Sequence, residues 1–153
     1  MKMMLDECLS LRASRVIVDA LQIHKPPVET HLLEDYLNTK GALDSDWAEH
    51  LEAEGGWCVI TTDYRTPRGH VARSKGPPLH LILPARKITA FFLTGKIASM
   101  SGFEKARSVI YTWPEIWHHA QIASPGTRFR ITRNGLGYML AQWPTTTNLP
   151  PSP

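Results

Sequence analysis

Strands that end at acidic residues recur in the first 63 residues, and this pattern constrains the fold more than any other feature. The apolar run Lys2–Leu5 predicts a buried strand that ends at Asp6 and Glu7. A later run, Trp57–Thr62, is rich in β-branched residues and ends at Asp63. The carboxyl ends of parallel strands meet at one edge of a sheet, which is where ligands bind. Asp6 and Asp63 are therefore expected to lie close together if their strands are near neighbours.

The segment between these strands predicts a β-α-β unit. Apolar residues recur at helical spacing over residues 9–21, and Ser10 is a suitable cap near the start of that helix. A pair of prolines then stops the helix before Val28–Leu33, a further strand followed by the acidic pair Glu34-Asp35. A crossover of this kind is right-handed and joins parallel strands. The first half of the chain therefore predicts an α/β fold with a mostly parallel sheet.

A second helix is predicted to open at the acidic stretch that contains Asp44 and Asp46, and a Gly-Gly pair ends it. Asp46 is predicted to lie at the start of this helix. A long loop before the helix could bring Asp46 to the same edge of the sheet as the other acids. Asp46 with Glu49 three residues later also matches a capping box, so this Asp has a purely structural explanation as well.

The second half of the chain predicts elements in a less regular order. They are a strand at His80–Leu83, helices at Ala85–Met100 and Phe103–Trp113, a further turn or helix from Pro114, and a strand at Thr127–Thr132. In the last strand, apolar residues alternate with arginines. This alternation predicts a half-exposed strand whose outer row holds Arg128, Arg130 and Arg133.

Length and composition are typical of one folded domain. The chain has 153 residues, of which 42% are hydrophobic, and we expect a single domain over residues 1–144. Residues 145–153 are rich in Thr and Pro and are expected to form a disordered tail. No apolar run reaches the length of a membrane span and no secretory leader is recognisable, so we expect a cytoplasmic protein with no membrane contact. The two cysteines are expected to be reduced thiols.

The net charge of +3 conceals two halves of opposite sign. Residues 1–63 carry 12 acidic and 5 basic side chains, a net charge of −7, whereas residues 64–153 carry 2 acidic and 12 basic ones, a net charge of +10. An acidic half suited to cations and a basic half suited to phosphates indicate a polyanion or a metal-linked function. An unevenly charged but passive surface is the alternative. The side chains expected to contact nucleic-acid phosphates are Arg65, Arg68, Arg73, Lys75 and Arg130.

Carboxylates gathered at one edge of a sheet require a positive partner. Two carboxylates about 4 Å apart repel by on the order of 4 kcal/mol at an effective dielectric of about 20. Oxygen ligands without nearby His or Cys favour Mg²⁺ or Mn²⁺ over zinc. The candidate catalytic and metal-binding residues are Asp6, Asp46 and Asp63. Taken singly, each of these acids could instead cap a helix or close a turn.

Several motifs in this order resemble the PIN-like domains of VapC-type toxins, and more narrowly a short PIN-like subgroup. They are Met4-Leu5-Asp6-Glu7, Asp46-Trp47 at a helix start, Val59-Ile60-Thr61-Thr62-Asp63, and Trp113-Pro114-Glu115-Ile116 after a long helix. The resemblance covers roughly residues 3–134. It implies a three-layer α/β/α fold and the activity of a metal-dependent endoribonuclease.

The resemblance also implies roles for individual residues and partners. Carried over by motif, Asp6, Asp46 and Asp63 hold Mg²⁺ or Mn²⁺, and Glu7 and Asp35 are further metal-site residues at positions that are often acidic in the subgroup. The implied substrate is RNA, and the implied protein partner is an antitoxin. A second copy of the chain, in a homodimer, is a further partner to test.

One departure from the commoner PIN pattern leaves the number of metal ions open, because Tyr64 and Arg65 follow Asp63 where a second acid is usual. Two other functions also stay open. A non-catalytic module that binds nucleic acid or a partner would use the acids as caps, and would bind RNA without metal. A phospho-receiver domain would need a Lys at a later strand end, and the stretch after His80–Leu83 matches this requirement poorly.

Overall fold

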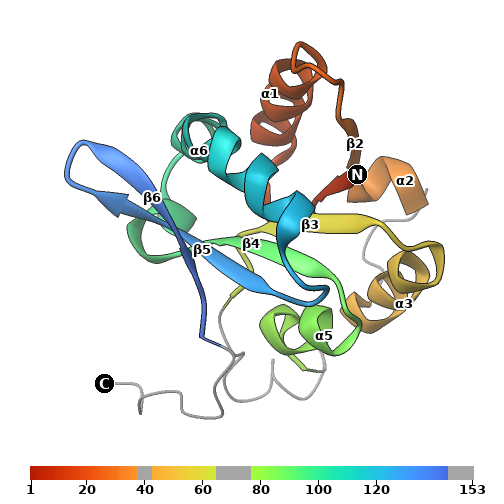
Figure 1. The fold of residues 1–153 in the computed structure, drawn as a ribbon. Coiled ribbons are helices and arrows are strands. Elements are labelled where there is room, and N and C mark those ends of the chain that lie inside the picture. The colour runs from red at the N-terminus through yellow and green to blue at the C-terminus, as the bar shows by residue number, and fades with distance from the viewer. Residues whose placement is uncertain (38–42, 65–76, 145–153) are drawn as a thin grey trace.

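The computed structural model describes residues 1–37, 43–64 and 77–144, and its centre is a six-stranded sheet (Figure 1). The strand order is β2-β1-β3-β4-β5-β6. Neighbouring strands are parallel except β5 and β6, which are antiparallel. The strands are β1 (Lys2–Leu5), β2 (Glu29–Leu32), β3 (Trp57–Thr61), β4 (Thr89–Leu93), β5 (Arg128–Asn134) and β6 (Gly137–Gln142).

Helices cover both faces of this sheet and give the molecule three layers (Figure 1). α1 (Leu11–Gln22) and α6 (Gly102–Ile122) lie on one face, and α3 (Asp44–Glu54) and α5 (Leu79–Ala85) lie on the other. Shorter elements join them: η1 (Glu7–Leu9), α2 (Leu33–Leu37) and η2 (Gly95–Ser99). The predicted α/β/α fold with a mostly parallel sheet is confirmed.

Alternating side chains along β1 divide the core into two clusters. Met3 and Leu5 pack with the apolar faces of α1 and α6, whereas Met4 packs with α3 and α5 on the opposite face. β3 alternates in the same way, with Ile60 in the first cluster and Val59 in the second. Strands buried on both faces are typical of a parallel sheet between helices. Asp6, directly after β1, and Thr62, directly after β3, are thereby held at the carboxyl edge of the sheet.

Local sequence signals set the ends of α1 and α3. Ser10 caps α1 as predicted, because its hydroxyl oxygen accepts the backbone N–H of Ala13 at 3.4 Å. α3 ends at Gly55, whose φ of +71° is a left-handed conformation that glycine adopts without strain. α3 begins at Asp44, one residue after its N-cap Leu43, so the capping box predicted from Asp46 does not form.

The prediction for residues 80–100 is wrong. His80–Leu83 lies inside helix α5 rather than in a strand, and the expected helix Ala85–Met100 is replaced by β4 and η2. The strand β4 was not predicted because all five of its residues are buried. Without an exposed position, the alternation that is typical of a strand does not appear in the sequence. Its two aromatic residues show the true pattern, since Phe91 packs with α6 and Phe92 packs with α5.

α6 is one helix of 21 residues that continues through Pro114, where the sequence predicted a break. A proline inside a helix removes one backbone hydrogen bond and costs about 3 kcal/mol. Val109, Trp113 and Ile116 are buried in the same core cluster on both sides of the proline, and this continuous apolar face favours an unbroken helix. None of the helices in the described part of the chain is long and apolar enough to cross a membrane.

The predicted arginine row on β5 is correct for Arg130 and Arg133, which are exposed, but wrong for Arg128. Arg128 is only 9% exposed. Its guanidinium donates to the carbonyl oxygens of His80 at 3.0 Å and Pro144 at 2.8 Å, and it lies over the Trp143 ring. The sequence also missed β6, the antiparallel strand that brings Trp143 back over the start of β5.

Candidate active site

The pairing of β1 with β3 brings Asp6 and Asp63 to the same edge of the sheet. Leu5 is in register with Ile60, and the backbone N–H of Asp6 continues the ladder by donating to the Ile60 carbonyl at 3.1 Å. Thr61 stands between the two acids. Its hydroxyl donates to Asp6 Oδ2 at 2.5 Å and accepts the backbone N–H of Asp63 at 2.9 Å. The expected proximity of the two acids is therefore present, and one threonine hydroxyl joins them.

Asp6 is a buried carboxylate among other negative charges. It is 4% exposed, and its pKa is raised from 3.8 to about 6. The largest cause is burial, which disfavours the charged form, and the negative charges of Asp44 and Asp63 raise the pKa further. The hydrogen bond from Thr61 acts in the opposite direction. A carboxylate in this position is favourable only when positive charge compensates it.

The structure brings Asp44 to this site rather than Asp46. Asp44 is half-buried at the first position of α3, and its Oδ1 accepts the indole N–H of the buried Trp47 at 3.2 Å. Asp46 is exposed and accepts the hydroxyl of Ser45 at 3.0 Å. Two residues along a helix correspond to a rotation of about 200°, so these acids point to nearly opposite sides of α3. The acid of α3 that acts electrostatically on Asp6 is therefore Asp44, two residues before the predicted Asp46.

Two features of the sequence indicate Asp44 and Thr61, although neither residue was predicted. Trp47 marks the inner face of α3, and the residue three positions earlier on a helix, here Asp44, shares that face. Thr61 is part of the Thr-x-Asp motif, but only the acid of that motif was given a role.

Glu7 and Asp35 are not among the acids whose charge raises the pKa of Asp6. Glu7 is exposed at the start of η1 and lines a small pocket together with Leu11 and Glu34. Asp35 is exposed on α2. The charges that shift the pKa of Asp6 come from elsewhere, on α3 and after β3.

The thiol of Cys8 adds a proton donor beside Asp6. Its hydrogen bond helps to stabilise the Asp6 carboxylate. Desolvation and the charges of Asp6, Asp63 and Asp44 raise the pKa of Cys8 to about 12. This thiol therefore stays protonated at neutral pH and is a poor nucleophile.

The predicted phosphate-binding residues Arg65, Arg68, Arg73 and Lys75 lie outside the described residues, so they stay predictions. Arg130 is described and is exposed on β5.

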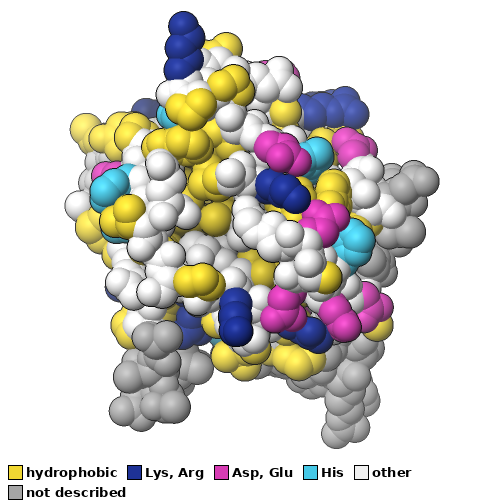
Figure 2. Space-filling view, turned by 45° about the vertical axis from the view of Figure 1, so that its right-hand side comes forward, with side chains coloured by type: hydrophobic (Ala, Val, Ile, Leu, Met, Phe, Trp, Pro, Cys, Tyr) yellow, Lys and Arg dark blue, Asp and Glu magenta, His cyan; other side chains and the backbone are white. Residues whose placement is uncertain are grey.

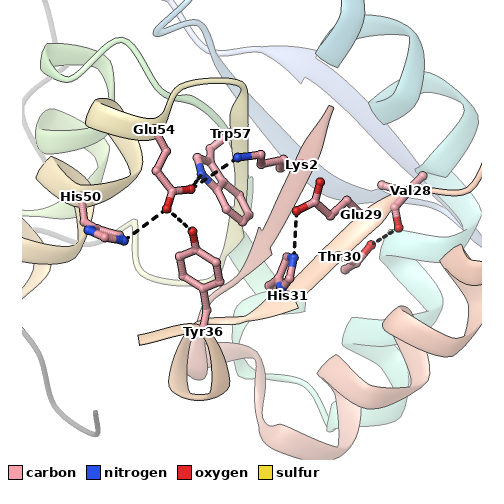
Figure 3. Close-up of polar contacts among 9 residues, drawn as sticks. All are labelled: Lys2, Val28, Glu29, Thr30, His31, Tyr36, His50, Glu54 and Trp57. Carbon is pink, nitrogen blue, oxygen red and sulfur yellow. Dashed lines mark hydrogen bonds and ion pairs between the residues drawn. The ribbon is translucent and has the colours of Figure 1, made fainter. Parts of the chain in front are cut away.

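Acids elsewhere on α3 are engaged by basic and aromatic partners. Figure 2 shows acidic side chains next to Lys, Arg and His side chains on one face of the molecule. Glu54 is the centre of one such group, at the amino end of β3 (Figure 3). It accepts hydrogen bonds from Tyr36, from the Trp57 indole at 3.0 Å and from Lys2 at 3.4 Å, and it pairs with His50. These donors, Tyr36 and Trp57 first, lower the pKa of Glu54 to about 2. This group joins α2, α3, β1 and β3 and has a structural role.

The acids at the carboxyl edge suit a hard divalent cation in their chemistry. Asp6, Asp44 and Asp63 offer carboxylate oxygens, which Mg²⁺ and Mn²⁺ prefer, and their mutual repulsion would be relieved by a cation. In geometry, no three His, Cys, Asp or Glu side chains within residues 1–37, 43–64 and 77–144 are drawn together closely enough to count as a preassembled metal site. Among these described residues, neither the expected set of Asp6, Asp46 and Asp63 nor the set of Asp6, Asp44 and Asp63 forms such a cluster.

Comparison with known proteins identifies a family that is similar to the first half of the chain. Residues 1–74 match the family model described as a PIN-like domain. Over residues 1–74 the chain is therefore PIN-like. The match spans β1 to β3 and therefore includes Asp6, Asp44 and Asp63. No curated protein and no solved structure matches the chain. A PIN-like domain is a nuclease-type fold, and the narrower assignment to VapC-type toxins stays a prediction.

Proposed function

We propose that this PIN-like domain is a divalent-metal-dependent ribonuclease that hydrolyses RNA phosphodiester bonds with Asp6, Asp44 and Asp63. The observation that carries the proposal is the buried Asp6, whose pKa is raised to about 6 beside two further acids at the carboxyl edge of a PIN-like sheet. A buried carboxylate with strongly shifted pKa in such a position is typical of a functional site. The toxin role, the antitoxin partner and a homodimer remain further proposals from the resemblance.

The chain's own groups position the three carboxylates. Thr61 holds Asp6 through its hydroxyl and holds the backbone of Asp63 through the same oxygen. The indole N–H of Trp47, a residue 2% exposed in the core, holds Asp44. When bound by these carboxylates, Mg²⁺ or Mn²⁺ supplies the positive charge that activates water and stabilises phosphate oxygens. The proposed role of the basic half of the chain is to hold the RNA backbone.

The direct test is incubation of the purified protein with a panel of single-stranded and structured RNAs, with Mn²⁺, with Mg²⁺ and with chelator. We expect cleavage products that require the metal. The Asp6→Asn variant, purified in parallel, is expected to give none and thereby excludes a contaminating nuclease. Metal-dependent cleavage that survives in Asp6→Asn would contradict the assignment of the site.

Metal binding can be tested without any RNA by thermal unfolding. A ligand that binds only the folded state stabilises it by about 2.7 kcal/mol at a hundredfold excess over its dissociation constant. For a domain of this size each kcal/mol raises the melting temperature by about 2–4 °C. We expect Mn²⁺ to raise the melting temperature of the wild type and not that of Asp6→Asn. Equal melting curves with Mn²⁺ and with chelator would count against a metal site.

A non-catalytic RNA-binding module is the second candidate, and one observation favours it. The described side chains do not form a preassembled metal site within residues 1–37, 43–64 and 77–144. Such a module would bind RNA equally well with Mn²⁺ and with chelator, and its affinity would fall with increasing salt. It would yield no cleavage products in the incubation described above.

A further inference from the structure

A groove lies between the first turns of α1 and α6, on the face of the sheet that these two helices cover. It has a volume of about 350 Å³ and is lined by Ser10, Arg12, Ala13, Val16, Gly102, Phe103 and Ala106. The two helices approach closely at its floor. A Cβ atom on Gly102 would lie 2.8 Å from the Ser10 hydroxyl oxygen, so a larger residue at this position would require that hydroxyl to move.

The groove presents apolar side chains to solvent. Phe103 is 74% exposed and Val16 is 51% exposed, whereas Ala13 and Ala106 form the buried base. An exposed aromatic ring of this kind is a platform on which an unpaired nucleobase can stack.

One basic side chain lines the groove, and a second lies on α6 two residues after Phe103. Arg12 is one of its lining residues, and the lining includes no carboxylate. Lys105, in the first turns of α6, donates to the Cys8 carbonyl oxygen at 3.4 Å. Among the residues that the structure describes, neither Arg12 nor Lys105 forms an ion pair. The nearest acid in sequence, Glu104, is engaged by Tyr138 at 2.7 Å and by Arg107 at 3.6 Å.

The groove and the candidate active site are linked through the residues that follow Asp6. Cys8 lies two residues after Asp6, and its thiol forms a hydrogen bond with the Asp6 carboxylate. Its backbone carbonyl oxygen accepts a hydrogen bond from Lys105. Ser10 ends the short helix η1 that starts directly after Asp6, and it also lines the groove. The short helix η1 therefore connects Asp6 to a residue of the groove lining.

We propose that this groove is a nucleotide subsite for single-stranded RNA. An unpaired base stacks on Phe103, and Lys105 and Arg12 contact the phosphates that flank it. The proposal rests on the proposed function, because it names the part of the substrate that lies beside the cleavage site. An apolar platform whose lining holds one arginine and no carboxylate suits a polyanion with exposed bases.

The subsite is tested by binding rather than by cleavage, so the result does not depend on the ribonuclease proposal. Fluorescence anisotropy with a labelled single-stranded RNA of about ten nucleotides in chelator gives the dissociation constant. We expect Phe103→Ala to weaken binding about tenfold and Phe103→Trp to preserve it, because stacking needs an aromatic face. We expect Lys105→Met to weaken binding and to reduce its salt dependence, since one phosphate contact is lost.

Matched controls lie far from the groove. Leu136, 94% exposed in the β5–β6 turn, is the control for an exposed apolar side chain, and Leu136→Ala should bind RNA as the wild type does. Lys87→Met is the control for lost charge at an exposed lysine outside the groove. An RNA with an abasic position is the control on the ligand, because it should make Phe103→Ala and the wild type more alike.

Two results would overturn the subsite. One is wild-type affinity in Phe103→Ala, and the other is the absence of single-stranded RNA binding by the wild type. A third outcome identifies a different occupant. If Phe103→Ala leaves RNA binding unchanged but abolishes self-association in sedimentation, the groove contacts a second copy of the chain and the nucleotide proposal is wrong.

Discussion

Replacing Asp44 by Asn should lower the rate of metal-dependent RNA cleavage by about a hundredfold or more, whereas replacing Asp46 by Asn should leave that rate nearly unchanged. Loss of residues that only support metal ligands costs about 10–100-fold, so loss of a ligand charge should cost at least as much. The two acids lie two residues apart on α3, but only Asp44 contributes negative charge at Asp6. Asp46 is exposed on another side of the helix.

The pair forms an internally controlled experiment because both substitutions remove one charge from the same helix. Asn at position 44 can still accept the Trp47 indole N–H through its amide oxygen, so the packing of α3 should persist. Single-turnover cleavage with saturating Mn²⁺ measures the chemical step, and thermal unfolding checks the fold. If Asp44→Asn is active and Asp46→Asn is inactive, the site proposed from the structure is wrong. The third acid is then Asp46, as the sequence predicted.

The first half of the fold was predictable because its signals are local. β1 and β3 are apolar runs that stop at charged residues, and Pro and Gly punctuate the helices between them. β4 was not predictable by the same reasoning, because a strand buried on both faces has no exposed position to reveal its period. Tertiary packing decided its conformation. The same applies to α6, where burial on both sides of Pro114 outweighs a residue that usually breaks a helix.

The candidate site was predictable to the extent that the sheet topology determines it. Asp6 and Asp63 follow parallel strands that pair directly, so their positions at one edge follow from the strand order alone. The third acid depends instead on how α3 is rotated about its axis. The burial of Trp47 in the core cluster beneath α3 and α5 sets that rotation. The spacing of residues along the chain gives no information about this contact. An error of two residues in a strand would have kept the side chain on the same face, but on a helix it reverses the face.

Replacing Asp6 by Asn should stabilise the metal-free protein by about 3 kcal/mol at pH 8, although the same change is expected to abolish activity. The pKa of Asp6 is raised from 3.8 to about 6 in the folded state, mainly because the carboxylate is buried. A raised carboxyl pKa favours folding fully below the unfolded pKa, and this contribution is lost as the pH rises through the folded value. Each pKa unit corresponds to about 1.4 kcal/mol. The neutral amide avoids this loss and can still accept the Thr61 hydroxyl.

Urea unfolding in chelator at two pH values tests both the size and the sign of this effect. The advantage of Asp6→Asn should be about 3 kcal/mol at pH 8 and about half as large at pH 5, where the folded carboxyl is largely protonated. Asp46→Asn, an exposed acid of the same domain, should show no such dependence. Saturating Mn²⁺ should then reverse the order at pH 8, because it stabilises only the protein that retains the Asp6 carboxylate. If Asp6→Asn is no more stable than the wild type at pH 8 without metal, its carboxylate is not held buried among other acids, and the electrostatic basis of the site fails.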